Sequence, residues 1–504
     1  MLGILWFISY ALVVMGLSAY GLHRFWMVYT YYKHKGNSFK PLSRFKKLPL
    51  VTVQLPVFNE LYVVERLIRS VAELDYPKEL MEIQVLDDST DETRELVAAV
   101  VGELKSKGFD IEQHHRKERT GFKAGALQAG LVKAKGEYIL IFDADFVPPR
   151  GLIRETIDHF TDPGIGMIQT RWGHLNRGMN FLTRVQALLL DGHLLIEQTA
   201  RNRSGRFFNF NGTAGIWRKR CIEEAGGWQH DTLTEDLDLS YRAQIRGWRF
   251  VFVPDVVTPA ELPLEMNAFK AQQHRWAKGA IQTCKKILPR VWKSELPLKI
   301  KLEATFHLTS NFAYLLLAML ALLIQPNPDY AGFQWKSILL IDVPIFMLAS
   351  FSIFVFYGVV LRELKYPWYK VLLYVPMLIA TGIGLCLNNA KAVLEALFNH
   401  ETEFARTPKY GACQAGTSGT LAGVWWKQKY QAARSLLPWL ELGMAGYYAY
   451  FVWFAWKQEL WVSLPFFVLF VMGFGFAGLF SLCQRSFFSA WLNRDRLPRV
   501  GLET

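Results

Sequence analysis

Residues Tyr138–Asp145 have the sequence YILIFDAD, an apolar run that ends in two aspartates separated by a single residue. Two earlier apolar runs share this plan: Leu50–Pro56 (LVTVQLP) ends at a proline, and Ile83–Asp88 (IQVLDD) ends in paired aspartates. Short strands followed by polar loops and helices are typical of a doubly wound sheet, whose ligands bind beyond the carboxyl ends of the strands. We therefore expect a doubly wound mixed sheet with an acidic site at one edge.

The Asp143-Ala144-Asp145 motif is a candidate metal site. Two carboxylates on one turn can share a Mg²⁺ or Mn²⁺ ion with a diphosphate, whose charge the ion stabilises as the nucleotide leaves. The alternative is a solvated surface turn. The soluble region Leu50–Pro259 contains neither GxGxxG nor GxxxxGK[ST], so we expect no glycine-rich loop to hold the phosphates, and other groups must neutralise them.

The segment LTED that ends at Asp236 is a second acidic candidate. Inverting sugar transfer needs a carboxylate that takes the proton from the attacking acceptor hydroxyl, and Asp236, next to Glu235, can supply one. Thr232 or Thr234 could equally cap a helix over Asp236–Arg246. The two interpretations are compatible, because a base at the start of a helix is also held rigidly.

The segment Gln272–Trp276 (QQHRW) lies in a basic amphipathic stretch, Met266–Lys293. An arginine beside an indole can bind a diphosphate while the ring stacks on a sugar face. The alternative is a basic helix that lies on lipid headgroups with tryptophan as its anchor. We expect one helix to do both, whereas the similar segment Gln169–Trp172 has a different spacing and is interpreted as structural.

The composition indicates that part of the chain lies in a membrane. Of 504 residues, 51% are hydrophobic and only 20% are charged, and the apolar excess lies outside Leu50–Pro259. The net charge of +13 favours contact with anionic headgroups and phosphates. Nucleic acid is not an expected partner, because the soluble region has no basic stripe with interleaved aromatic residues. Five cysteines without a CxxC pair predict neither a zinc site nor disulfides, and we expect them to be buried.

Five membrane spans are expected. The first, Leu2–Tyr20, is uncharged and has a basic C-terminal flank, so the chain that follows it is expected in the cytosol. Val371–Asn388 is apolar enough to cross, but a crossing there would place two basic segments outside. We therefore interpret it as interfacial or re-entrant, which gives five spans rather than six. The other four are expected at Ala304–Ile324, Ser337–Leu361, Ser435–Trp456 and Trp461–Cys483.

Six motifs in a fixed order carry a resemblance to a known family. The motifs are Asp87-Asp88, Lys123-Ala124-Gly125, Asp143-x-Asp145, Asn211-Gly212-Thr213, Thr234-Glu235-Asp236 and Gln272-x-x-Arg275-Trp276. In this order they resemble a processive, membrane-integrated family 2 glycosyltransferase of the cellulose synthase superfamily, and most of all the plant cellulose-synthase-like mannan and glucan synthases and their bacterial relatives. The resemblance is dense from Val51 to Lys293 and looser in the membrane part. Ser89 departs from it, because a glycine commonly follows the paired aspartates.

The resemblance implies a GT-A-type domain joined to a helical transmembrane bundle with interfacial amphipathic helices. It also implies Asp236 as the general base, with Glu235 beside it. The nucleotide sugar would contact Pro56, Glu60, Asp87, Asp88, Lys123, Asp143, Gln272, Arg275 and Trp276; the acceptor would contact Asn211, Gly212, Thr213 and Trp276; Asp143 and Asp145 would hold Mg²⁺ or Mn²⁺; and Thr407, Pro408 and Lys409 would belong to a loop that closes over the nucleotide.

The expected organisation follows from these assignments. The catalytic domain would be cytosolic, on a bacterial inner membrane or, in a eukaryote, on the Golgi membrane. The expected parts are an N-terminal transmembrane anchor (1–32), the catalytic domain (48–262), interfacial helices with the QxxRW motif (263–300), a transmembrane bundle (301–484) with a gating-like loop (401–412), and a basic cytosolic tail (485–504).

Three functions are open to such a chain. The first is an inverting hexosyltransferase that extends a β-linked glucan or mannan from UDP-glucose or GDP-mannose and passes it across the membrane. The second is transfer of a single sugar to a membrane lipid, similar to ceramide glucosyltransferase. Binding of a nucleotide sugar without turnover is the third, and the presence of Asp236 and of Asp143-x-Asp145 argues against it. The expected partners are the donor, a polysaccharide or lipid acceptor and membrane lipids; accessory subunits are left open.

Overall fold

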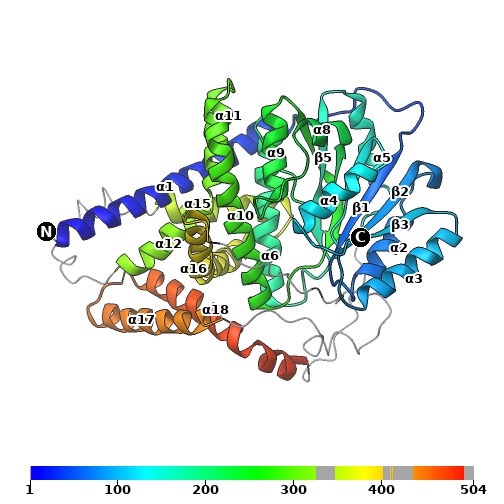
Figure 1. Ribbon diagram of the computed structural model, residues 1–504. Helices are drawn as coiled ribbons and strands as arrows, with labels where there is room; N and C mark the ends of the chain where they lie inside the picture. The colour runs from blue at the N-terminus through cyan, green and yellow to red at the C-terminus, as the bar shows by residue number, and fades with distance from the viewer. Residues whose placement is uncertain are drawn as a thin grey trace.

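The computed structural model of the protein describes residues 2–324, 347–400, 409, 411, 435–461 and 463–492. Figure 1 shows an α/β domain on one side of the molecule and a group of helices on the other. The long N-terminal helix α1, Leu2–His34, lies with the helices. Helix α10, Met266–Lys293, joins the two parts, because it packs against α9 (Glu235–Ile245) and against α16 (Lys370–Leu397).

The α/β domain is built on a seven-stranded sheet in the order β3-β2-β1-β4-β6-β5-β7. Strands β3, β2, β1 and β4 are parallel, β6 is antiparallel to β4 and β5, and β7 is parallel to β5. The mixed, doubly wound sheet expected from the sequence is confirmed. The strands are β1 (Val51–Val57), β2 (Met81–Asp87), β3 (Asp110–His115), β4 (Tyr138–Ile141), β5 (Ile165–His174), β6 (Gly215–Arg218) and β7 (Arg249–Ala260).

Helices cover both faces of this sheet. Successive residues of a strand point to opposite faces, so each strand contributes side chains to both of the cores beneath these helices. In β4, Tyr138 and Leu140 belong to a core shared with α2, α3 and α5, whereas Ile139 and Ile141 belong to the core under α4, α8 and α9. An unbroken apolar strand is the pattern of a sheet buried on both faces. These helices are α2 (Val64–Ala72), α3 (Thr93–Ser106), α4 (Phe122–Lys133), α5 (Leu152–Thr156) and α8 (Lys219–Glu224), with 3₁₀ turns at Lys78–Leu80 and Ile157–Thr161.

The carboxyl ends of β1, β2 and β4 meet at one edge of the sheet. Val57, the last residue of β1, is paired with Asp87, the last residue of β2. Gln54 in β1 is paired with Ile141, which ends β4 two residues before Asp143. The strand register therefore brings the two acidic loops to the same edge.

A helical insertion separates β5 from β6. Helix α6, Phe181–Asp191, begins with a capping box and continues into a π-helix, η3 (Gly192–Gln198), and then into α7 (Thr199–Arg203). The insertion packs against α1 and against α15 (Ser352–Glu363). Gly192 permits this approach, because a Cβ atom there would lie 2.9 Å from the ring of Phe356.

The remaining helices form a second packing unit around α16, which contacts α10, α12 and α18, while α17 packs along α18. Gly384 allows α16 and α18 to approach closely, since an added Cβ atom would lie 2.6 Å from the carbonyl oxygen of Gly473. The further elements are α11 (Leu298–Thr309), α12 (Phe312–Leu323), the π-helix η6 (Met347–Phe351), α17 (Leu437–Lys457) and α18 (Leu464–Leu492).

Within the residues that the structure describes, three helices are long and apolar enough to cross a membrane, at Gly3–His34, Lys370–Leu397 and Leu464–Cys483. Helices α11 and α12 would add a fourth span if the 55° bend between them interrupts a single crossing. The first expected span, Leu2–Tyr20, is therefore part of a longer helix, and the expected span Ala304–Ile324 is divided by the bend.

Other expectations about the spans differ from the structure. Residues 371–388, expected to be interfacial or re-entrant, lie within the continuous 28-residue helix α16, whose length and composition suit a crossing. The expectation rested on loop charges, which report sidedness rather than helix continuity. Helix α17, an expected span, is not among the candidates in the described part of the chain, and it carries a buried Glu441. The expected span Ser337–Leu361 is described only from residue 347 onward.

The cysteines largely follow expectation. Four of them lie within the described residues, and each is a free thiol. Cys221, Cys284 and Cys386 are buried, whereas Cys483 is partly exposed. Cys413 lies outside the described residues.

Candidate active site

Both aspartates at the end of β2 are buried and held by hydrogen bonds. Asp87 accepts the backbone N–H of Ser89 at 2.8 Å and Nε2 of Gln113 at 2.7 Å. Asp88 accepts Nε and Nη2 of Arg116 at 2.8 and 2.6 Å, which makes a bidentate ion pair. The same guanidinium donates to two carbonyl oxygens in the segment that leads into α4. Asp88 therefore anchors the connection between β3 and α4.

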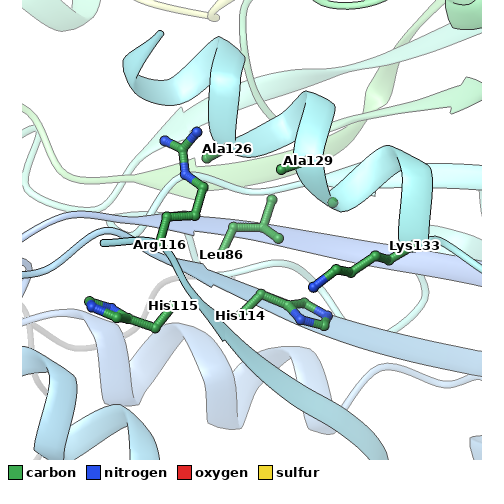
Figure 2. A pocket seen from close by; sticks show the side chains of 8 residues that line it. Leu86, His114, His115, Arg116, Ala126, Ala129 and Lys133 are labelled. Atoms are coloured by element: carbon green, nitrogen blue, oxygen red, sulfur yellow. The ribbon is translucent and has the colours of Figure 1, made fainter. Parts of the chain in front are cut away.

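A pocket lies on the α4 side of this connection, between that helix and strands β2 and β3 (Figure 2). None of the residues that line it belongs to the predicted site, but Arg116 links it to the acidic edge through Asp88. The pocket is lined by Leu86, His114, His115, Arg116, Ala126, Ala129, Gly130 and Lys133.

Asp143 lies just beyond β4 and is paired with Lys123 near the start of α4. The Nζ atom of Lys123 is 2.6 Å from Oδ1 of Asp143 and 2.9 Å from the carbonyl oxygen of Gly212. Burial would raise the pKa of Asp143, but the ammonium of Lys123 outweighs it and holds that pKa below its ordinary value. Burial would likewise lower the pKa of the lysine, but the carboxylates of Asp143, Glu235 and Asp236 raise it. Lys123 thus lies between the Asp143-x-Asp145 motif (the DxD motif) and the Thr234-Glu235-Asp236 motif (the TED motif).

The second aspartate of the DxD motif, Asp145, has a different lysine partner. The Nζ atom of Lys409 lies 2.5 Å from Oδ1 of Asp145 and 3.8 Å from Oε1 of Glu60. These carboxylates raise the pKa of Lys409 above its ordinary value in spite of its burial. Thr407 and Pro408, the other two residues of the expected gating loop, lie outside the described residues.

The DxD carboxylates suit a hard divalent cation, since Mg²⁺ and Mn²⁺ prefer carboxylate oxygens. In the part of the chain that the structure describes, no group of three or more His, Cys, Asp or Glu side chains could hold a metal ion. A cation at Asp143 and Asp145 would therefore take its remaining ligands from the diphosphate and water. Both carboxylates already face a positive charge, from Lys123 and Lys409.

The TED motif is held against helix α10. The N–H of Leu233 donates to Oε1 of Gln282 at 3.0 Å, and the hydroxyl of Thr234 lies 3.0 Å from that of Thr283. Thr234 occupies the N-cap position of α9 without a side-chain capping hydrogen bond, so the capping alternative is wrong for this residue. A Cβ atom on Gly279 would lie 2.8 Å from the backbone nitrogen of Thr234, so only glycine allows this approach.

Glu235 and Asp236 form the first turn of α9. Burial, and after it the neighbouring Glu235, raises the pKa of Asp236 to about 7. Burial also raises the pKa of Glu235, although Lys123 opposes this effect. A carboxyl group that titrates near neutrality is suited to general base catalysis at neutral pH.

Arg275 of the QxxRW motif faces both acidic motifs from helix α10. Burial lowers the pKa of its guanidinium, while the carboxylates of Glu235, Asp143, Asp236 and Asp145 oppose that change. Gln272 and Trp276 are partly exposed on the same helix. Arg275 therefore lies in the electrostatic field of all four acidic residues.

The predicted acceptor loop, Asn211–Thr213, connects the two acidic motifs. The N–H of Asp143 donates to Oγ1 of Thr213 at 2.9 Å. Gly212 has a φ of +81°, and a Cβ atom on it would lie 3.0 Å from Oδ2 of Asp236. The buried Gln169 accepts the N–H of Asn211 at 2.9 Å, in keeping with its structural interpretation.

The structure thus brings most of the predicted residues to one edge of the sheet, with Pro56 near the end of β1 and Glu60 shortly after it. Sequence reasoning missed Arg116 and its pairing with Asp88. The available signal was an arginine directly after β3, because β3 ends at the same edge as β2.

Comparisons with known proteins agree with this geometry. Residues 49–279 match the model of the glycosyltransferase-like family 2. The chain is 41% identical over 255 residues to glucomannan 4-beta-mannosyltransferase 1 of Cyamopsis tetragonoloba. The aligned region covers 50% of this chain and 48% of that protein. It is also 41% identical over 252 residues to glucomannan 4-beta-mannosyltransferase 2 of Arabidopsis thaliana, covering 49% and 47%. The chain spans about half the length of these curated relatives.

Among solved structures, the chain is similar to a mannosyltransferase from Pyrobaculum calidifontis in complex with GDP-Man and Mn²⁺. The TM-score is 0.54 at 20% identity, and the match covers 78% of this chain and all of that one, which shows a shared fold. Over residues 49–279, somewhat less than half of the chain, the protein is similar to the family 2 glycosyltransferases, and the curated relatives that match this region are glucomannan mannosyltransferases.

Proposed function

We propose that the chain is an inverting hexosyltransferase that extends a β-linked polysaccharide from a nucleotide-diphosphate sugar. The observation that carries the proposal is the position of Asp236: a partly buried carboxyl, with its pKa raised to about 7, beside the glycine of the acceptor loop and near Lys123 and Arg275. A base, a cationic pocket for a leaving diphosphate and an acceptor loop are what inverting transfer requires.

In the proposed reaction, Asp236 takes the proton from an acceptor hydroxyl. The hydroxyl oxygen forms a bond to the anomeric carbon of the donor sugar as the bond from that carbon to the diphosphate oxygen breaks. The nucleoside diphosphate leaves with the electron pair, and Lys123 and Arg275 stabilise its charge. A divalent cation held by Asp143 and Asp145 would supply further positive charge to this diphosphate.

GDP-mannose is the first donor to test. The curated relatives are named glucomannan 4-beta-mannosyltransferases, and the similar solved structure contains GDP-Man and Mn²⁺. UDP-glucose is the second donor, because the motifs are shared by glucan synthases. A β-1,4-linked mannan or glucomannan is the corresponding product.

The helical part supports a role in moving the product. Helix α10 carries Arg275 and packs directly against α16 and α18, two of the helices that are long and apolar enough to cross a membrane. A chain that grows at the acceptor loop would therefore begin beside these helices. We propose that the product passes between them, with the catalytic domain on the cytosolic side.

The proposal is tested by supplying the purified protein in detergent with GDP-mannose or UDP-glucose and Mn²⁺ or Mg²⁺. Product length is then measured before and after treatment with β-mannanase or cellulase. A glycanase-sensitive polymer is expected. A product of one sugar on a lipid, with every donor, would replace this proposal by the lipid-transfer alternative.

A further inference from the structure

The π-helix η3 carries a polar cluster that the proposed reaction does not use. π-helical turns are rare and are frequently found at functional sites. On η3, Nδ1 of His193 lies 3.1 Å from Oε2 of Glu197, which also accepts Nη1 of Arg201 at 3.3 Å. The side chains of His193 and Glu197 are 31% and 29% exposed, so the pair is not sealed within the core.

The histidine of this pair reaches the acceptor loop. Nε2 of His193 lies 3.2 Å from Oδ1 of Asn211. The same oxygen accepts Nε2 of Gln198 at 3.0 Å and Nδ2 of Asn209 at 3.0 Å. If the side-chain amide of Asn211 were rotated by 180°, its NH₂ group would face the NH₂ groups of Gln198 and Asn209. These neighbours therefore fix which end of the Asn211 amide is the oxygen.

The other end of that amide has a different environment. Nδ2 of Asn211 is buried and has no hydrogen-bond partner among the described residues. It is one of several buried polar atoms without a partner among the described residues, Oε1 of Gln198 being another, and a ligand that supplies an acceptor would satisfy it. The next residue, Gly212, lies beside Asp236: a Cβ atom added to Gly212 would be 3.0 Å from Oδ2 of Asp236. The unpaired donor therefore lies on the loop that meets the proposed base.

We propose that His193 and Glu197 are positioning residues: they hold the Asn211 amide so that its Nδ2 faces a ring hydroxyl of the acceptor sugar that the resemblance places at this loop. The inference rests on the proposed function. A neutral amide suits a sugar hydroxyl, whereas the charged diphosphate is served by Lys123 and Arg275. The acceptor hydroxyl that attacks must lie at Asp236, which places its neighbouring hydroxyls beside the loop.

The test compares two rates in each variant: transfer to added manno-oligosaccharide, and slow release of nucleotide from GDP-mannose without acceptor. Asn211→Ala and His193→Ala should each raise the acceptor KM by about ten-fold, the effect of one hydrogen bond, and in His193→Ala nucleotide release should stay near that of the wild type. His193→Gln should restore much of the acceptor KM, because its amide can still donate to Oδ1 of Asn211. Glu197→Gln should give a smaller rise, since the imidazole loses a charged partner.

The matched control is His114→Ala, which removes a histidine of the pocket in Figure 2, outside the site, and should change neither rate. An unchanged acceptor KM in Asn211→Ala would overturn the inference, as would equal impairment of His193→Ala and His193→Gln. These outcomes require a wild-type protein that transfers sugar. If the wild type transfers none with any donor, the proposed function itself has failed.

Discussion

The Nζ atom of Lys409 lies 2.5 Å from Oδ1 of Asp145, although 264 residues separate the two in sequence. Glu60, after strand β1, lies 3.8 Å from the same ammonium group. A residue that lies between helices α16 and α17 in the chain therefore contacts the acidic edge of the sheet directly. We therefore expect Lys409 to compete with any divalent cation that binds at Asp145.

Lys409→Met should reduce the Mn²⁺ concentration that gives half-maximal transfer, because a neutral side chain no longer competes for Asp145. We expect a change of about ten-fold, the equivalent of about 1.4 kcal/mol. A titration of activity with Mn²⁺ measures it, and Lys409→Arg, which keeps the charge, serves as the control. The same half-maximal concentration in Lys409→Met and wild type would show that the lysine and the metal do not share this carboxylate.

Gly279→Ala should impair catalysis and stability together. The added methyl group would lie 2.6 Å from Cγ2 and 2.8 Å from the backbone nitrogen of Thr234, so the TED motif must move. We expect a loss of about 1–3 kcal/mol in the free energy of unfolding and a lower kcat. Gly382→Ala is the matched control, because nothing lies within 4 Å of a Cβ atom there. If both variants keep wild-type Tm and kcat, α10 does not hold the motif as described.

Arg116→Met should destabilise the protein, because it leaves the carboxylate of the buried Asp88 without its ion-pair partner. The expected loss in the free energy of unfolding is about 3–5 kcal/mol. Adding Asp88→Asn to the same chain should recover part of that loss, since the unpaired charge is removed. Thermal unfolding of both variants tests the relationship, and a double variant less stable than Arg116→Met would contradict it.

The rate of transfer should depend on pH through Asp236. Burial raises the pKa of this carboxyl to about 7, and only its deprotonated form can act as a base. As pH falls through that pKa the base becomes protonated, so kcat/KM should fall about ten-fold per pH unit below about pH 7 and level off above it. A profile that stays flat down to about pH 5 would mean that no group with this raised pKa takes the proton.

Much of the acidic edge could be predicted from sequence because local patterns determine it. A short apolar strand that runs directly into aspartates, as at Tyr138–Asp145, predicts both the strand and the edge at which its carboxylates lie. The order of the motifs then gave the resemblance to family 2 glycosyltransferases, whose model matches residues 49–279. The candidate base and the two metal-site aspartates needed no knowledge of distant contacts.

The partners of these residues could not be predicted in the same way. Arg116 pairs with Asp88, 28 positions away in sequence, and Lys409 pairs with Asp145, 264 positions away. Both pairs form through tertiary packing, which no local sequence pattern records. The π-helix at Gly192–Gln198 likewise depends on contacts with α1 and α15. For residues 371–388, loop charge favoured an interfacial or re-entrant segment, whereas the structure places them in one continuous helix whose length and composition suit a crossing.

The central claim is that a single carboxylate, Asp236, serves as the proton acceptor for sugar transfer. The most direct test is Asp236→Asn, which keeps the side-chain shape, with transfer of labelled mannose and GDP affinity measured on the same preparation. The account predicts that transfer falls by about 10²–10⁴-fold while GDP affinity stays within about two-fold of wild type, because losing a base affects the transition state and not nucleotide binding. Transfer at the wild-type rate, or GDP binding lost together with transfer, would contradict it.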